Sequence, residues 1–98
     1  MDKKEILAKL GGIPESIYDS IVASFYTETK VRLVDLRKAL EANDFLGASR
    51  CAHAIKGSAA NLHLYEINAI AKSLEAALKA NQTDQAKDLL SKLTTLIP

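Results

Sequence analysis

The stretch DFLGASRCAHAIKGSAANL, residues 44–62, decides the fold, because its apolar residues recur every three or four positions. That spacing places them on one face of an α-helix. The residues on this face are Phe45, Ala48, Ala52, Ile55, Ala59 and Leu62. Asn43-Asp44, just before them, is a turn and N-cap signal. We therefore predict a helix over residues 44–61 with this face turned toward a core.

The residues before this stretch also follow a helical pattern. A short helix is predicted from Asp2, ending at Gly11-Gly12. Pro14 suits the first position of the next helix, whose apolar stripe is interrupted by the polar residues 27–30. The pattern over residues 14–42 predicts either two helices or one kinked helix.

Two further stripes follow the central stretch. Residues 61–65 form the next break, and apolar residues at helical spacing then cover 67–78. Thr83 can cap a last helix, whose apolar residues run from 86 to 97.

The composition also favours a helical domain. The chain has 98 residues, of which 48% are hydrophobic and only 5% aromatic, with few Val and Pro and much Ala and Leu. Short loops between amphipathic helices favour antiparallel neighbours. We predict an all-α fold: an antiparallel up-down four-helix bundle with additional N-terminal helical segments, forming a single domain over residues 1–98.

Charge and cysteine content exclude several classes of protein. The net charge of +1 gives no support for bulk binding to nucleic acid. Cys51 is the single cysteine, so an internal disulfide is excluded; we expect it to fill space on the core side. A zinc site from Cys51, His53 and His63 would lack a fourth ligand, and no metal or other cofactor is expected. With no apolar run after Met1, we expect a cytoplasmic protein without membrane association, and the end at Pro98 suggests a freestanding chain.

His53 lies on the side of its helix away from the apolar face. Residues advance about 100° each around a helix. This rotation puts the following residues on the His53 side: Leu46, Ser49, Arg50, Lys56, Gly57 and Ala60. The imidazole is predicted to be exposed in a clearing made by Ser49, Gly57 and Ala60. Since no Asp or Glu occurs between Asp44 and Glu66, we expect the surface around it to be locally positive.

This arrangement suits the chemistry of a phosphoryl group. A neutral imidazole nitrogen is a nucleophile that can attack phosphorus, and cations nearby can stabilise the phosphoryl oxygens. Lys56 and Arg50 are predicted to supply those cations, with Leu46 as an exposed apolar contact for a partner. Gly57 costs about 1 kcal/mol in mid-helix relative to Ala. It indicates either the close approach of a large partner or relief of crowding against another helix.

The run of residues 52–62, AHAIKGSAANL, resembles the signature of histidine-containing phosphotransfer (HPt) domains, His-x-hydrophobic-Lys-Gly-Ser/Ala. The resemblance extends over residues 14–97 and includes Leu74-Glu75, which matches a Leu-Glu pair that the family usually has beyond the motif. One departure is His63-Leu64, where the family usually has Gly-Ala. His63 is expected either to adopt a left-handed conformation or to end the helix differently.

The resemblance implies a four-helix bundle that relays a phosphoryl group between aspartates of receiver domains. His53 would be the phosphoacceptor, Lys56 would support the phosphate and Gly57 would give access. The implied partners are response-regulator receiver domains and a sensor histidine kinase of the simple or hybrid type. A monomeric covalent carrier rather than an enzyme is expected, since the glycines form no phosphate-binding loop for ATP.

Two other functions remain open from the sequence. The chain could be a helical module that docks on a receiver or kinase domain without accepting phosphate. It could also be the dimerisation hairpin of a sensor kinase, although Ala54 follows His53 where an acidic residue would be expected.

Overall fold

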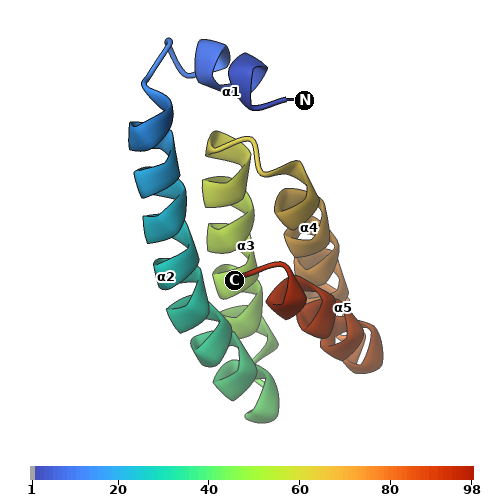
Figure 1. Ribbon diagram of the computed structural model, residues 1–98. Coiled ribbons are helices and arrows are strands. Elements are labelled where there is room, and N and C mark those ends of the chain that lie inside the picture. The colour runs from blue at the N-terminus through green and yellow to red at the C-terminus, as the bar shows by residue number, and fades with distance from the viewer. Residues whose placement is uncertain (1) are drawn as a thin grey trace.

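The computed structural model describes residues 2–98, which form five helices and no strand (Figure 1). The helices are α1 (Lys3–Lys9), α2 (Glu15–Glu41), α3 (Phe45–Asn61), α4 (Tyr65–Lys79) and α5 (Thr83–Thr95). The prediction of an all-α fold is confirmed. Among the described residues, no helix has the length and apolar character needed to cross a membrane.

Helices α2 to α5 pack in chain order, each running opposite to the one before it (Figure 1). Helix α3 is central, because it contacts α2 on one side and α4 on the other, and α5 packs on α4. A hydrogen bond of 2.7 Å from Arg37 Nη2 to Thr94 Oγ1 also links α2 to α5. Helix α1 lies across one end of the bundle, as an additional N-terminal segment.

Helix α2 is one continuous helix from Glu15 to Glu41, so the polar stretch 27–30 does not divide it. Thr29 explains why. Its side chain is buried in the core, four residues after the buried Phe25 and four residues before the buried Leu33. The apolar face therefore continues through a threonine, whose methyl group suits a buried position on a helix.

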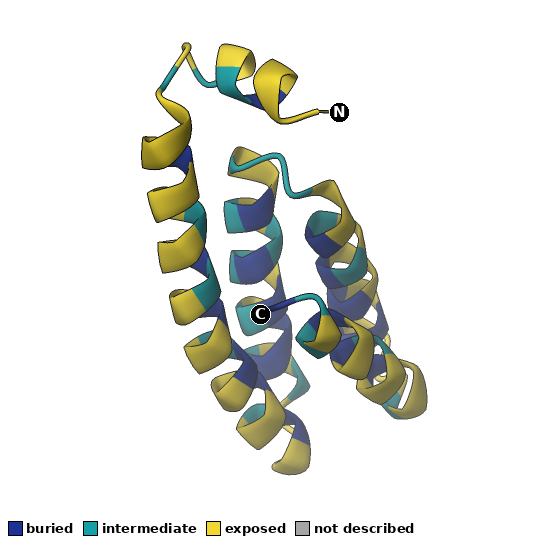
Figure 2. Cartoon of the chain, in the orientation of Figure 1, coloured by how far each residue is buried: buried dark blue, intermediate teal, exposed yellow. Residues whose placement is uncertain are grey.

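The core lies where the inner faces of α2 to α5 meet (Figure 2). The largest fully buried side chains are Leu36, Ile55, Leu74, Leu78, Leu93 and Thr29. On α3 the buried face is mostly small, with Ala48, Ala52 and Ala59 fully inaccessible to solvent. Small side chains on the central helix let its neighbours pack closely against it.

The three turns between the bundle helices have the same geometry. Each has a non-glycine residue with a positive φ of 55–58°: Asn43, His63 and Asn81. At the second turn, His63 N donates to Ala60 O at 3.1 Å and Leu64 N donates to Ala59 O at 2.9 Å, which is the Schellman pattern. His63 thus adopts the left-handed conformation, and helix α3 ends in the same way as α2 and α4.

Two helix starts lie one residue away from their predicted positions. Pro14 is the N-cap of α2 rather than its first residue, and Gln82 rather than Thr83 is the N-cap of α5. Neither cap residue makes a side-chain hydrogen bond to its helix. Asp44 caps α3 as expected, since its side chain accepts a hydrogen bond of 2.9 Å from Gly47 N.

The complete burial of Leu36 on α2 predicts a large effect of truncation at this position. Because this side chain is fully buried, we expect Leu36→Ala to lower the free energy of unfolding by about 2–5 kcal/mol. Val34→Ala, at a position that is 46% exposed on the same helix, should stay within about 0.5 kcal/mol of the wild type. Urea denaturation followed by circular dichroism measures both values, and equal effects would contradict the described core.

Candidate functional site

His53 projects from the solvent-facing side of α3, opposite the alanines that face the core. Its side chain is 66% exposed, as helical periodicity predicted. The same face carries the exposed Leu46, Arg50, Gly57 and Ala60. Successive turns of one helix thus present a row of residues to solvent with the imidazole near its middle.

Gly57 lies one turn beyond His53 and leaves the backbone bare. A Cβ atom placed there would meet no other atom within 4 Å, because it would point into open space. Crowding against another helix is therefore not the reason for a glycine at this position. The low surface beside the imidazole is made by Gly57 and the exposed Ala60.

Ser49 does not belong to this open surface, contrary to the prediction. Its side chain is buried, and its hydroxyl donates a hydrogen bond of 2.9 Å to the Leu46 carbonyl oxygen. Ser49 lies beside α4, since it lines a hollow together with Leu78 and Lys79 of that helix.

The contact that defines the site comes from α4. The Glu75 side chain is only 8% exposed, and its Oε2 atom lies 2.9 Å from Nδ1 of His53. Its other oxygen, Oε1, accepts a hydrogen bond of 2.8 Å from Lys56 Nζ. Lys79 Nζ, one turn further along α4, lies 3.2 Å from Oε2. The sequence did not indicate that a carboxylate from the neighbouring helix lies within the surface around His53, where the cations Arg50, Lys56 and Lys79 outnumber it.

Three donors keep Glu75 ionised. Burial alone would raise the pKa of its carboxyl group, but hydrogen bonds from Lys56, Lys79 and His53 outweigh burial and lower that pKa to about 2. At neutral pH the carboxylate can only accept hydrogen bonds.

The ionised carboxylate determines the tautomer of His53. Because Glu75 has no proton to donate, the hydrogen bond at Nδ1 requires the imidazole to donate its N–H there. In the neutral ring, the lone pair is then on Nε2. The buried carboxylate thus leaves a nucleophilic nitrogen on a side chain that is mostly in solvent.

The two predicted cations differ in their surroundings. Lys56 is 27% exposed, and its ammonium group is bound to Glu75. Arg50 is exposed and, with His53, lines a surface hollow of about 330 Å³. The other residues lining this hollow are Leu46, Ser49, Glu75 and Lys79.

Sequence reasoning missed the contacts of Glu75 and the presence of Lys79. Two signals were available. First, Glu75 interrupts an apolar stripe between Leu74 and Leu78, and a charged side chain in such a position needs an oppositely charged partner. Second, Lys79 follows Glu75 by four residues, which is the spacing of an ion pair on a helix. Cys51 lies where it was predicted, packed against the core, and burial raises the pKa of its thiol.

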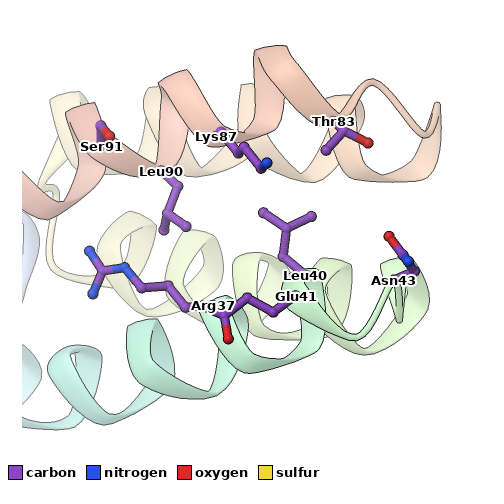
Figure 3. A pocket seen from close by; sticks show the side chains of 8 residues that line it. All are labelled: Arg37, Leu40, Glu41, Asn43, Thr83, Lys87, Leu90 and Ser91. Carbon is purple, nitrogen blue, oxygen red and sulfur yellow. The ribbon is translucent and has the colours of Figure 1, made fainter.

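A larger hollow, of about 490 Å³, lies between the end of α2 and α5 (Figure 3). It is lined by Arg37, Leu40, Glu41, Asn43, Thr83, Lys87, Leu90 and Ser91. It shares no residue with the row around His53. The imidazole of His53 therefore lies on an open helix surface, away from this hollow.

Two comparisons with known proteins found a match. A family model described as Hpt domain matches residues 20–98. "Multistep phosphorelay regulator 1" of Schizosaccharomyces pombe is 30% identical over 87 residues. This match covers 80% of the chain but only 30% of that relative's length. No solved structure gives a significant match.

The ion pairs of Glu75 predict a pH-dependent stability. A carboxyl group whose pKa falls from 4.5 to about 2 on folding stabilises the fold above pH 4.5, and this contribution is lost as the pH falls toward 2. Relative to Glu75→Gln, the wild type should lose up to about 3 kcal/mol of unfolding free energy over that interval. Urea titrations at several pH values measure the difference, and parallel pH profiles for the two proteins would contradict it.

Proposed function

Because the chain belongs to the Hpt domain family, we propose that it is a phosphorelay intermediate that carries a phosphoryl group on His53. The group would come from the phospho-aspartate of one receiver domain and pass to another receiver domain. The observation that carries this proposal is the exposed imidazole whose Nδ1 is held by the buried Glu75 carboxylate at 2.9 Å. A carrier needs such a nitrogen, both nucleophilic and open to a partner.

The transfer step follows from the tautomer. The Nε2 lone pair attacks phosphorus, an Nε2–P bond forms, and the P–O bond to the donor aspartate breaks, so the aspartate leaves as a carboxylate. Nε2 carries no proton, so none has to be removed before attack. The proton on Nδ1 stays, and the positive charge that develops on the ring is stabilised by Glu75. The reverse step delivers the group to the next aspartate.

Lys56 and Arg50 are the cations closest in sequence to the phosphoacceptor. Each is three residues from His53 on α3, and side chains three residues apart are neighbours on a helix surface. Phosphoryl transfer depends mainly on positioning and on stabilising the charge of the phosphoryl oxygens. In this proposal Lys56 makes the main contact to those oxygens and Arg50 adds long-range attraction.

Gly57 and Ala60 give a receiver domain room to bring its aspartate to Nε2, and Leu46, which is 62% exposed, offers an apolar contact. The fission yeast relative is a phosphorelay regulator by its name, which fits receiver domains and a sensor histidine kinase of the simple or hybrid type as partners. We place the protein in the cytoplasm as a monomeric carrier that has no ATP site of its own.

A module that only docks on its partners would have no need for this arrangement at His53. A buried carboxylate is costly unless it is paired, and here it orients an imidazole that projects into solvent. Carrying a phosphoryl group accounts for that arrangement, whereas docking alone does not.

The proposal predicts that the label depends on His53. When the protein is mixed with a receiver domain carrying ³²P on its aspartate, we expect a labelled product that is stable in base and labile in acid. His53→Gln should remove the label completely, while His63→Gln, a change of the other histidine, should retain it. A label that persists in His53→Gln would assign the phosphoacceptor elsewhere.

The variant Gly57→Gln tests whether a partner's access to His53 can be blocked without unfolding the protein. Its side chain would point into open space, so the variant should fold, with an unfolding free energy up to about 1 kcal/mol higher than that of the wild type. The transfer rate should fall at least about tenfold, since a bulky side chain would stand where the partner approaches. Ser91→Gln, at an exposed position on α5, is the matched control, and normal transfer in Gly57→Gln would show that the low surface is not needed.

A further inference from the structure

The two oxygens of Glu75 have different partners. Oε1 accepts its bond from Lys56, which comes from α3, at 2.8 Å. Oε2 is shared by His53 Nδ1 at 2.9 Å and by Lys79 at 3.2 Å, and Lys79 belongs to the same helix as Glu75. The bonds at Oε2 can therefore persist when the bond at Oε1 breaks.

Lys56 faces two competing anions once a phosphoryl group reaches Nε2. It is the cation bound to Glu75, and it is also the lysine three residues from the phosphoacceptor. If it turned to the phosphoryl oxygens with no replacement, a carboxylate that is 8% exposed would keep only the imidazole N–H as its partner. A buried charge left in that state opposes the movement strongly.

Lys79 is suited to be that replacement. Its side chain is 64% exposed, so it can adjust its position without disturbing the core, and its bond is among the causes of the low pKa of Glu75. The pair between Lys92 and Asp88 on α5 has the same spacing of four residues, but both of its side chains are more than half exposed. Of these two pairs within one helix, the Lys79 pair is the one with a buried acceptor, and a buried acceptor depends much more on its cation.

We propose that Lys79 is a positioning residue for phosphoryl transfer. It keeps the negative charge of the buried Glu75 carboxylate paired with a cation while Lys56 turns from Oε1 to the incoming phosphoryl oxygens. This inference rests on the proposed function, and it adds a residue that acts through Glu75 and Lys56 rather than by touching the phosphoryl group. Glu75 then stays ionised, and His53 keeps its proton on Nδ1 throughout the step.

Single-turnover transfer from a phosphorylated receiver tests the kinetic consequence. Lys79→Gln should lower the maximal rate roughly three- to tenfold with an unchanged half-saturating receiver concentration. Lys79→Arg should restore most of the rate, and Lys92→Gln, with the same loss of charge in an exposed pair, should have no effect. A rate for Lys79→Gln equal to that of the wild type, or a change in half-saturation alone, would overturn the proposal.

A double-mutant cycle tests whether Lys79 acts through Glu75. In a Glu75→Gln background there is no carboxylate to compensate, so adding Lys79→Gln should change the rate no more than Lys92→Gln does. An equal loss in both backgrounds would mean that Lys79 contacts the phosphoryl group or the partner directly, which would contradict the inference.

A measurement without any transfer tests the compensation itself. Lys56→Gln mimics the departure of Lys56, and the Glu75 carboxyl carbon can be followed by NMR as the pH is lowered. We expect its titration midpoint to stay below 4.5, the ordinary value, in Lys56→Gln and to rise clearly in Lys56→Gln/Lys79→Gln. The same midpoint in the two variants would show that Lys79 cannot take over from Lys56.

These experiments separate the inference from the proposed function. If the wild type accepts no phosphoryl group, the proposed function fails. The positioning role of Lys79 in transfer then fails with it, whatever the titration shows. If the wild type and Lys79→Gln accept the group at the same rate, the proposed function stands and only the inference is lost.

Discussion

The hydrogen bond between the buried Glu75 carboxylate and Nδ1 of His53 joins the chemistry of this protein to its packing. The carboxylate is held by α4 and the imidazole by α3, so their distance of 2.9 Å depends on how these two helices pack together. A shift of one helix along the other by a single turn, about 5.4 Å, would break this hydrogen bond. The ring proton would then no longer be held on Nδ1. The reactivity of an exposed side chain is thus determined by a contact that solvent hardly reaches.

The small residues of α3 are part of the same constraint. Ala48, Ala52 and Ala59 are fully buried, and they let α2 and α4 pack against the central helix without bulky side chains in between. Close packing brings Glu75 within reach of both His53 and Lys56, which are three residues apart on α3. The core alanines therefore support the proposed function indirectly, because the close packing that they allow positions the carboxylate of Glu75 next to His53.

Helical periodicity was enough to place His53 on the open side of α3, because an angle around a helix axis depends only on positions in the sequence. It could not show that α2 is continuous, since Thr29 looks polar in a sequence but occupies a core position in the fold. The sequence signalled that Glu75 needs a partner but could not identify that partner as His53, because the register between α3 and α4 is set by interdigitating side chains and the turn at His63. Ser49 was misplaced for a related reason: its angle puts it near His53, but α4 covers that flank.

Two residues break local rules in a chain whose patterning is otherwise regular. Gly57 lies in the middle of helix α3 with no steric reason inside the molecule, and Glu75 puts a charge into an apolar stripe. Both are unfavourable on their own, and they lie close together, since Glu75 binds Lys56, the residue just before Gly57. Exceptions of this kind are expected to gather where function outweighs stability. Gly57 lies on the open face of α3, and the buried Glu75 lies beneath His53 on that face, away from the larger hollow between α2 and α5. This position fits a protein whose reacting atom must be offered to a partner and not enclosed.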